Sequence, residues 1–184
     1  MIRGDSSEYE LLEKWTKDFD CQGYKTCEIG VREGLGSKII MDNVRNNYIH
    51  VGVDPYGNLE YQHYDDTGAY TCDYTDDMRD TMLNDFKPYR NQGKFTLCNM
   101  TDTKFMNDTE HRHSTFAFVH FDGPHMTKDV MTEAVWFANR SAKGTRFIFD
   151  DYPTYNMALV AQVLEYYNFK VIESGKNKCL MERK

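Results

Sequence analysis

Aspartates stand at the ends of two apolar runs of the sequence. Asp122 follows TFAFVHF, and Asp150 and Asp151 follow RFIF. If the two runs form neighbouring parallel strands, their ends lie about 5 Å apart. Two carboxylates at that separation repel by about 3 kcal/mol at an effective dielectric constant of about 20, and a third acid then needs a proton or a cation. We therefore predict that Asp122, Asp150 and Asp151 are ligands of Mg²⁺, or of Mn²⁺ or Ca²⁺.

A histidine stands three residues after the first of these aspartates, at position 125. Imidazole titrates near neutral pH, so a histidine beside a metal can act as a general base toward a substrate hydroxyl. Asp122 and His125 are thus the predicted catalytic residues. The sequence leaves alternatives open, namely a turn at Asp122, a solvated helix cap at Asp150 and Asp151, and a surface position for His125.

A glycine-rich segment, CEIGVREGLGS, follows an earlier apolar run and holds Glu28, Gly30, Gly34 and Gly36. Its glycines allow a tight turn and a close approach of a ligand to the backbone. Asp54 ends the next apolar run, 20 residues after Gly34, and its carboxylate can accept both hydroxyls of a ribose. Together these residues predict an adenosine site, with a plain turn and a turn cap as the alternatives. The glycine spacing differs from G-x-G-x-x-G, which disfavours a nicotinamide cofactor.

The elements that must position these residues follow from hydrophobic periodicity. Residues 1–23 are predicted to contain an amphipathic helix, which Ser7 and Glu10 would start as a capping box. Strand-like runs then alternate with helical segments, which is typical of a doubly wound sheet. The runs are CEIG, YIHVGVD, KFTLCNM, TFAFVHFDG, RFIFDD, FKVIES and KCLMERK.

We therefore expect an α/β fold in which residues 1–184 form one domain. Its Rossmann-like, mostly parallel seven-stranded sheet would carry helices on both faces. The last strand must run antiparallel, because only a few residues connect it to the strand before. Residues 56–75 form a tyrosine-rich insertion without a clear period, and such a long loop is usually functional or has its own short structure.

Composition excludes several partner classes. The net charge of -7 disfavours nucleic acid and anionic membranes, which are bound through basic surfaces. Five cysteines without a C-x-x-C pair indicate reduced thiols, and no run approaches the ~20 apolar residues of a membrane span, so a cytoplasmic setting is expected. His111 and His113 have charged neighbours, which favours a solvated loop over a metal pair.

The motifs CEIGVREGLGS, VGVDPY, FVHFDGPH and FIFDDY, in this order, resemble those of class I S-adenosylmethionine-dependent methyltransferases. The resemblance is to the small metal-dependent branch that includes macrocin O-methyltransferase-like sugar enzymes, and it spans the chain from about residue 25 to the end. It departs from that branch at Pro124, which replaces the commoner acidic residue before the histidine. The tyrosine-rich insertion is a further departure and could serve as a lid or a stacking surface.

The resemblance implies roles for individual residues. Glu28 and the loop from Gly30 to Gly36 would hold the methionine part of the cofactor, and Asp54 its ribose. Thr101 and Asp102 would border the adenine. The three aspartates at 122, 150 and 151 would hold the metal, which would orient the acceptor hydroxyl, and His125 would take its proton.

The implied activity is metal-assisted O-methylation of a small-molecule or sugar hydroxyl, with S-adenosylmethionine as methyl donor. The resemblance leaves homo-oligomer formation open. Two other functions also remain open. A metal-dependent hydrolase would use the aspartates to activate water, and a non-catalytic module would bind the cofactor without turnover.

Overall fold

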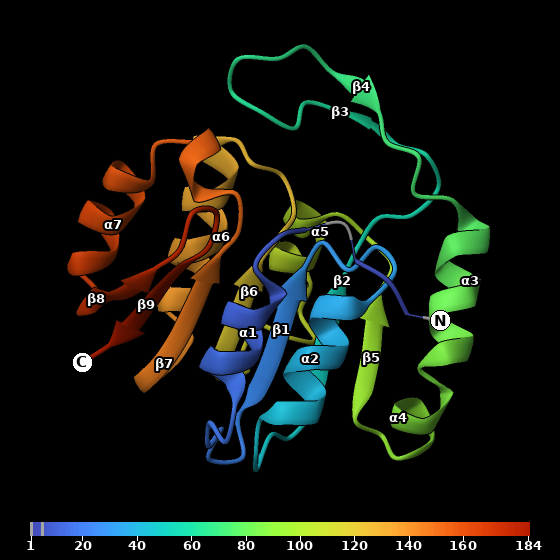
Figure 1. Ribbon diagram of the computed structural model, residues 1–184, viewed down its shortest axis with the longest axis horizontal. Helices are drawn as coiled ribbons and strands as arrows, with labels where there is room; N and C mark the ends of the chain where they lie inside the picture. Colours follow the sequence, from blue (N-terminus) through green and yellow to red (C-terminus); the bar gives the residue numbers. More distant parts are fainter. Residues whose placement is uncertain (1, 5) are drawn as a thin grey trace.

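In the computed structural model, which describes residues 2–4 and 6–184, seven strands form one sheet in the order β5-β2-β1-β6-β7-β9-β8 (Figure 1). The first five in this order are parallel, and β9 is antiparallel to both β7 and β8. The predicted fold class is confirmed. The strands are β1 (Lys25–Ile29), β2 (His50–Val53), β5 (Phe95–Cys98), β6 (Phe116–Phe121), β7 (Ser141–Phe149), β8 (Phe169–Ser174) and β9 (Cys179–Arg183).

The central strands end level with one another. Every residue of β6 is buried, as the continuous apolar run predicted for a strand covered on both faces. Phe121, at the end of β6, lies opposite Ile29 of β1 and Phe149 of β7. The residues that follow these strands therefore emerge at the same edge of the sheet, so the adjacency that the aspartate hypothesis requires is present.

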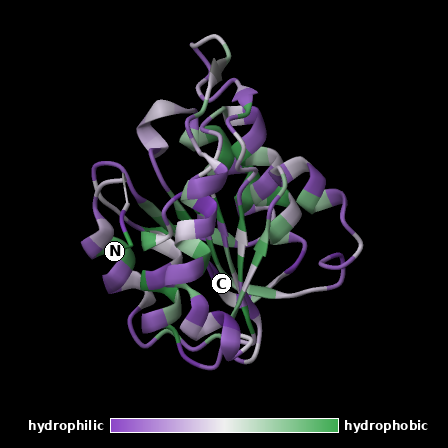
Figure 2. Cartoon of the chain, turned by 90° about the vertical axis from the view of Figure 1, so that its right-hand side faces the viewer, coloured by the Kyte–Doolittle hydropathy of each residue, from purple (hydrophilic) through white to green (hydrophobic). Residues whose placement is uncertain are grey.

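Helices cover both faces of the sheet, and both hydrophilic and hydrophobic residues occur along them (Figure 2). Leu12, Trp15 and Ile40 pack α1 and α2 against one face, while Phe105, Phe137 and Leu164 belong to the core under α5, α6 and α7 on the other. Met82 and Phe86 pack α3 and its end against Phe95 of the edge strand β5. The helices are α1 (Tyr9–Thr16), α2 (Leu35–Asn43), α3 (Asp76–Asp85), α4 (Lys87–Asn91), α5 (Asp102–Asn107), α6 (Thr127–Ala138), α7 (Met157–Glu165) and the 3₁₀ turn η1 (Tyr152–Thr154).

The N-terminal helix is shorter than the predicted range 1–23, and the predicted capping box is wrong. α1 begins at Tyr9, preceded by Glu8 in the left-handed conformation (φ 57°), and no side chain caps it. The reason lies in tertiary contacts. The Glu8 carboxylate accepts hydrogen bonds from the backbone N–H groups of residues 176–178, in the turn between β8 and β9, and Ser7 Oγ accepts one from Asn177.

The tyrosine-rich insertion has its own short structure. β3 (Glu60–Tyr61) and β4 (Tyr70–Thr71) form an antiparallel hairpin that stands above the carboxyl edge of the large sheet (Figure 1). Gly57 and Asn58 close its base by donating to the carbonyl of Tyr74. Within the described residues, no helix combines the length and the apolar character that crossing a bilayer requires.

Candidate active site

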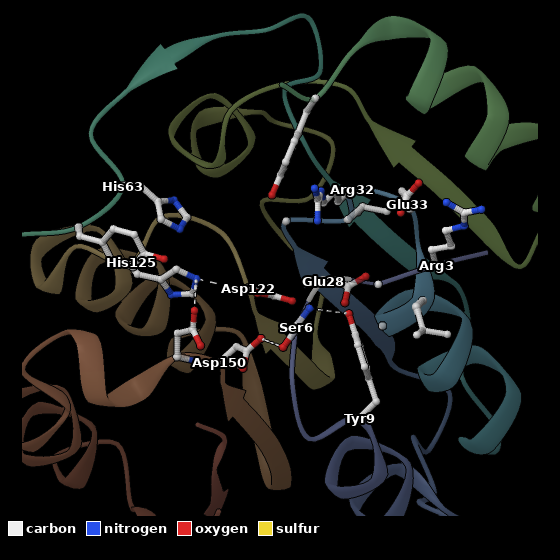
Figure 3. A pocket seen from close by; sticks show the side chains of 18 residues that line it. Arg3, Ser6, Tyr9, Glu28, Arg32, Glu33, His63, Asp122, His125 and Asp150 are labelled. Carbon is white, nitrogen blue, oxygen red and sulfur yellow. Dashed lines mark hydrogen bonds and ion pairs between the residues drawn. The ribbon is translucent and has the colours of Figure 1, made fainter. Parts of the chain in front are cut away.

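Two cavities lie side by side at the carboxyl edge of the sheet. The larger measures about 400 Å³ and is lined by residues from the ends of β1, β2 and β6 and from the hairpin. The smaller measures about 190 Å³ and is lined partly by the N-terminal segment (Figure 3). Gly30, His63, Tyr74 and Asp122 line both. A ligand extending from one cavity into the other would therefore pass the end of β1.

Asp54 lies at the wall of the larger cavity, directly after β2, and is 1% exposed. Its Oδ2 accepts hydrogen bonds from the backbone N–H groups of Val31 (2.9 Å) and Arg32 (2.8 Å). Its Oδ1 is buried without a hydrogen-bond partner. Burial raises the pKa of Asp54 to about 6, although the two N–H groups oppose the shift. A ligand hydroxyl would supply the missing donor, as predicted for a ribose.

Glu28 is held by a buried hydrogen-bond chain. His120 Nδ1 lies 2.8 Å from Glu28 Oε1, and the Ser37 hydroxyl donates to Oε2. His50 Nε2 lies 2.9 Å from Ser37 Oγ, and its Nδ1 lies 2.8 Å from Thr26 Oγ1. Because a carboxylate only accepts, Ser37 donates to Glu28 and must accept from His50. Burial lowers the pKa of His50 to about 3, so this ring is neutral and its tautomer is fixed.

Two of the predicted glycines allow close backbone approaches. Gly30 has φ 84°, and a Cβ there would collide with the carbonyl of Asp122. A Cβ on Gly36 would collide with Glu28 Oε1. Gly34 differs, because a Cβ there would meet the ring of Phe86. Gly30 and Gly36 therefore shape the cavity around Glu28, whereas Gly34 supports the packing of α3.

Thr101 and Asp102 border the larger cavity from the side of β5. Thr101 is the N-cap of α5, and its hydroxyl accepts a hydrogen bond from the backbone N–H of Lys104. Asp102 is the first residue of that helix. The structure thus places both residues on the same cavity as Asp54.

The three predicted metal ligands line the smaller cavity. Among the described residues, however, the ligand atoms that lie within 4.8 Å of one another are those of Glu28, His120 and Asp122, so only one of the three belongs to such a group. Asp122 follows β6 and Asp150 follows β7, while Asp151 begins the turn η1 with φ 45°. The Asp122 side chain is 20% exposed and that of Asp150 is 1% exposed. Burial and the charge of Asp150 raise the pKa of Asp122 well above its usual range. Asp122 and Asp150 thus lie close enough to affect each other's ionisation, as expected for carboxylates at neighbouring strand ends.

A lysine that the sequence did not single out lies against Asp150. Lys178 is fully buried, and its Nζ lies 2.7 Å from Asp150 Oδ1. The Ser6 hydroxyl donates to Oδ2 of the same carboxylate (Figure 3). Burial acts to raise the pKa of Asp150. The electrostatic interactions with Lys178 first and with His120 second outweigh burial and lower the pKa.

His125 faces two of the aspartates. Its Nε2 lies 3.9 Å from Asp122 Oδ1 and 3.8 Å from Asp151 Oδ2. The residue is 4% exposed. Its burial is the main cause that lowers its pKa to about 3, and the neighbouring His63 adds to this shift. A neutral imidazole therefore stands between two acids at the cavity wall.

Ring contacts from the hairpin and from Tyr155, before α7, hold the imidazole of His125. The ring stacks against Tyr64 (centroids 5.8 Å apart) and Tyr155 (6.1 Å), and it meets His63 edge to face at 4.7 Å. The backbone N–H of His125 also donates to the carbonyl of His63. Side-chain rotation of His125 is therefore restricted by residues of the insertion, which sequence periodicity did not indicate.

The sheet order and the carboxylate after its second strand define a class I S-adenosylmethionine-dependent methyltransferase. The chain belongs to the methyltransferase domain family, whose model matches residues 27–152. No curated protein matches the sequence.

Solved structures share the fold at low identity. An rRNA methylase from Streptococcus thermophilus is 9% identical, with 100% of this chain and 98% of that chain covered and a TM-score of 0.53. A ribosomal protein L11 methylase from Lactobacillus delbrueckii subsp. bulgaricus is 10% identical, with coverage of 95% and 76% and a TM-score of 0.58. MycE, from the mycinamycin biosynthetic pathway and in complex with Mg and SAH, is 14% identical, with coverage of 95% and 48% and a TM-score of 0.58. These names point to different acceptors, so the shared fold does not set the acceptor.

Proposed function

We propose that the protein transfers the methyl group of S-adenosylmethionine to a hydroxyl group of a small molecule or sugar. The observation that carries this proposal is the buried imidazole of His125 beside Asp122 and Asp151, at the cavity that adjoins the Asp54 cavity. A hydroxyl acceptor needs such a base, because its proton must leave when the new C–O bond forms.

The cofactor would span the two cavities. The partnerless Oδ1 of Asp54 would accept a hydrogen bond from the ribose, and Thr101 and Asp102 would border the adenine. Glu28 would accept from the methionine amino group in the smaller cavity, while Gly30 lets the chain pass close to β6. When bound, the cofactor supplies a methyl group on a sulfonium, and the protein orients it toward the acceptor.

His125 would bind and deprotonate the acceptor. Its ring would accept the hydroxyl proton, and the nearby carboxylates of Asp122 and Asp151 would stabilise the resulting imidazolium, whose formation burial opposes in the protein without ligand. The ring contacts from Tyr64 and Tyr155 would hold the imidazole in one orientation. Positioning of the hydroxyl and removal of its proton are thus the contributions of this chain's own residues.

A divalent cation, Mg²⁺ or else Mn²⁺ or Ca²⁺, is part of the proposal. The donor set is all oxygen, which suits these ions. Asp122 and Asp151 would hold the cation once their side chains turn toward each other, and Asp150, the third predicted ligand, is already ion-paired with Lys178. A bound cation would lower the pKa of an acceptor hydroxyl.

A small acceptor fits the charges better than RNA does. The smaller cavity gathers Glu28 and the three aspartates, and the whole chain carries a net charge of -7. Phosphate groups would be repelled by both. Aromatic rings of the hairpin, including Tyr64 and Tyr74, line the cavities and offer stacking surfaces for a sugar or an aromatic ring.

An acceptor screen tests the function. Purified protein, S-adenosylmethionine and Mg²⁺ are incubated with a library of sugars and phenols, and S-adenosylhomocysteine release is measured. We expect turnover on a hydroxyl compound, its loss in His125→Ala, and unchanged cofactor affinity in that variant. Metal affinity without cofactor affinity would instead indicate a hydrolase. Cofactor binding with no turnover across the library would indicate a non-catalytic module.

A further inference from the structure

A chain of buried hydrogen bonds joins Glu28, at the wall of the smaller cavity, to Lys178, just before β9. His120 links the two residues, because its Nδ1 lies 2.8 Å from Glu28 Oε1 and its Nε2 lies 3.4 Å from Lys178 Nζ. His120 and Lys178 are 0% exposed, and Glu28 is 1% exposed. Buried polar groups need partners within the protein, so the donors and acceptors of this chain must match.

Contacts with distant segments fix the position of Lys178. The Glu8 carboxylate accepts hydrogen bonds from the backbone N–H groups of residues 176–178, and Lys178 Nζ lies 2.7 Å from Asp150 Oδ1. A lysine is rarely buried completely unless it is paired, and Asp150 supplies the opposite charge. The fold therefore holds an ammonium beside the ring of His120.

The ammonium determines which nitrogen of His120 carries the hydrogen. An ammonium has only N–H donors and no lone pair, so every polar atom that it contacts must accept. Around Lys178 Nζ these atoms are Asp150 Oδ1, Ser6 Oγ at 2.9 Å and His120 Nε2. Nε2 therefore accepts, and the hydrogen of the ring lies on Nδ1. The other tautomer would turn an N–H toward the ammonium and a lone pair toward Glu28.

The Nδ1–H tautomer orients the carboxylate of Glu28. Nδ1 donates to Oε1, and the Ser37 hydroxyl donates to Oε2, so each oxygen receives a hydrogen bond from the protein. A carboxylate has about four acceptor positions, so lone pairs remain for a ligand. Glu28 lines the smaller cavity (Figure 3). An ammonium group of a ligand in that cavity would be a suitable donor.

We propose that Lys178 is a positioning residue for the cofactor, which fixes the tautomer of His120 and thereby orients Glu28 toward the amino group of S-adenosylmethionine. The inference rests on the proposed contact between Glu28 and that amino group. Because Lys178 is 0% exposed, it acts through His120 and not by touching the cofactor. Without Lys178, the hydrogen can move to Nε2, and the lone pair of Nδ1 then repels the carboxylate and turns it away.

Nitrogen-15 NMR of the full chain without ligand tests the tautomer. Long-range proton–nitrogen correlations show which ring nitrogen carries the hydrogen, and the signals of His120 are those lost in His120→Gln. We expect Nδ1–H in the wild type and in the matched control Lys176→Met, whose lysine is exposed two residues away. Lys178→Met should populate Nε2–H. Nε2–H in the wild type, or an unchanged tautomer in Lys178→Met, would overturn the proposal. The wild-type spectrum decides even if Lys178→Met fails to fold.

Calorimetry with two ligands tests the consequence for binding. S-adenosylhomocysteine carries the amino group, and 5′-methylthioadenosine lacks the whole amino-acid part. We expect Lys178→Met to bind S-adenosylhomocysteine about tenfold more weakly and 5′-methylthioadenosine as the wild type does, because only the contact of Glu28 is lost. In a Glu28→Gln background, Lys178→Met should cause little further loss, since both changes act on one contact.

An equal loss for the two ligands, or an unchanged affinity for S-adenosylhomocysteine, would overturn the proposal. Both readouts are independent of turnover, so they separate this proposal from the proposed function. Absence of methyl transfer together with the expected tautomer and affinities would reject O-methylation and support the role of Lys178. Methyl transfer by a wild type whose His120 carries Nε2–H would support O-methylation and reject that role.

Discussion

The backbone N–H of Arg32 lies 2.8 Å from Oδ2 of Asp54, and this bond, with that from Val31, leaves Oδ1 of the same carboxylate without a partner. The glycine-rich turn after β1 thus orients the carboxylate that follows β2. One oxygen is used to join the two strand ends, and the other remains for a ligand in the larger cavity.

Asp54→Ala should weaken the binding of S-adenosylhomocysteine by about tenfold to a hundredfold, because hydrogen bonds to a charged group contribute about 1.5–3 kcal/mol. Calorimetry measures this change. Asp77→Ala, at an exposed position of α3, is the matched control and should bind as the wild type does. Unchanged affinity in Asp54→Ala would reject the ribose site.

Cofactor affinity should depend on pH through Asp54. Its pKa is raised to about 6 in the protein without ligand, so the carboxyl is increasingly protonated below that pH. Ribose hydroxyls donate to the ionised form, so binding lowers this pKa and must release the proton. Affinity should therefore be constant above about pH 7 and fall by up to about tenfold per pH unit below about pH 6.

Calorimetry of S-adenosylhomocysteine binding from about pH 5 to about pH 8 measures that dependence. Two buffers with different ionisation enthalpies count the protons released. Asp54→Ala should remove the step, and a pH profile shared by this variant and the wild type would place the titration on another group.

Sequence patterns predicted the frame of the site because they depend on local repetition. Continuous apolar runs identified β6 and β7 as buried strands, so Asp122 and Asp150 had to emerge together at one edge. The position of Asp54 after β2 followed in the same way. Such inferences need only the period of a segment and the rule that parallel strands end at a common edge.

Other parts of the site depend on contacts between distant segments. Lys178 stands in the polar stretch GKNK, which has the composition of a solvated turn, and Glu8 and Ser6 bury it from the other end of the chain.

His111 was predicted to be solvated, which is wrong. It is 3% exposed, because its ring packs on Phe105 and its Nε2 lies 3.5 Å from Cys98 Sγ. The residues next to Lys178 and His111 in the sequence therefore give no sign that these two side chains are buried. A histidine within a fully buried strand is different, because it needs polar partners, and His120 could have indicated the hydrogen-bond network around Glu28.

Asp65→Ala should loosen the hairpin and slow methyl transfer. The Asp65 carboxylate accepts hydrogen bonds from the backbone N–H (3.1 Å) and hydroxyl (2.5 Å) of Thr127, which tie the hairpin to the start of α6. Without them, Tyr64 should hold His125 less firmly. We expect faster hydrogen exchange in residues 60–71 and a lower kcat. Asp66→Ala, at the neighbouring exposed position, is the control, and equal exchange in the two variants would contradict the anchoring role.

Gly36→Ala should lower both stability and cofactor affinity. Gly36 lies in α2, where alanine normally stabilises a helix by about 1 kcal/mol. Here the added Cβ would collide with Oε1 of Glu28. Oε2 of the same carboxylate accepts from Ser37 and Oε1 contacts His120, so the carboxylate cannot move aside without breaking these buried hydrogen bonds. Overpacking of this kind costs about 1–3 kcal/mol and should outweigh the helical gain.

Thermal unfolding should then show a Tm lowered by a few degrees, because about 1 kcal/mol corresponds to roughly 2–4 °C in a chain of this size. Calorimetry should show weaker binding of S-adenosylhomocysteine as Glu28 is displaced. Gly68→Ala is the matched control, since a Cβ at that exposed hairpin position meets nothing within 4 Å. If Gly36→Ala raised the Tm and bound the cofactor normally, Glu28 would have to be mobile, and its assignment to the methionine amino group would lose its basis.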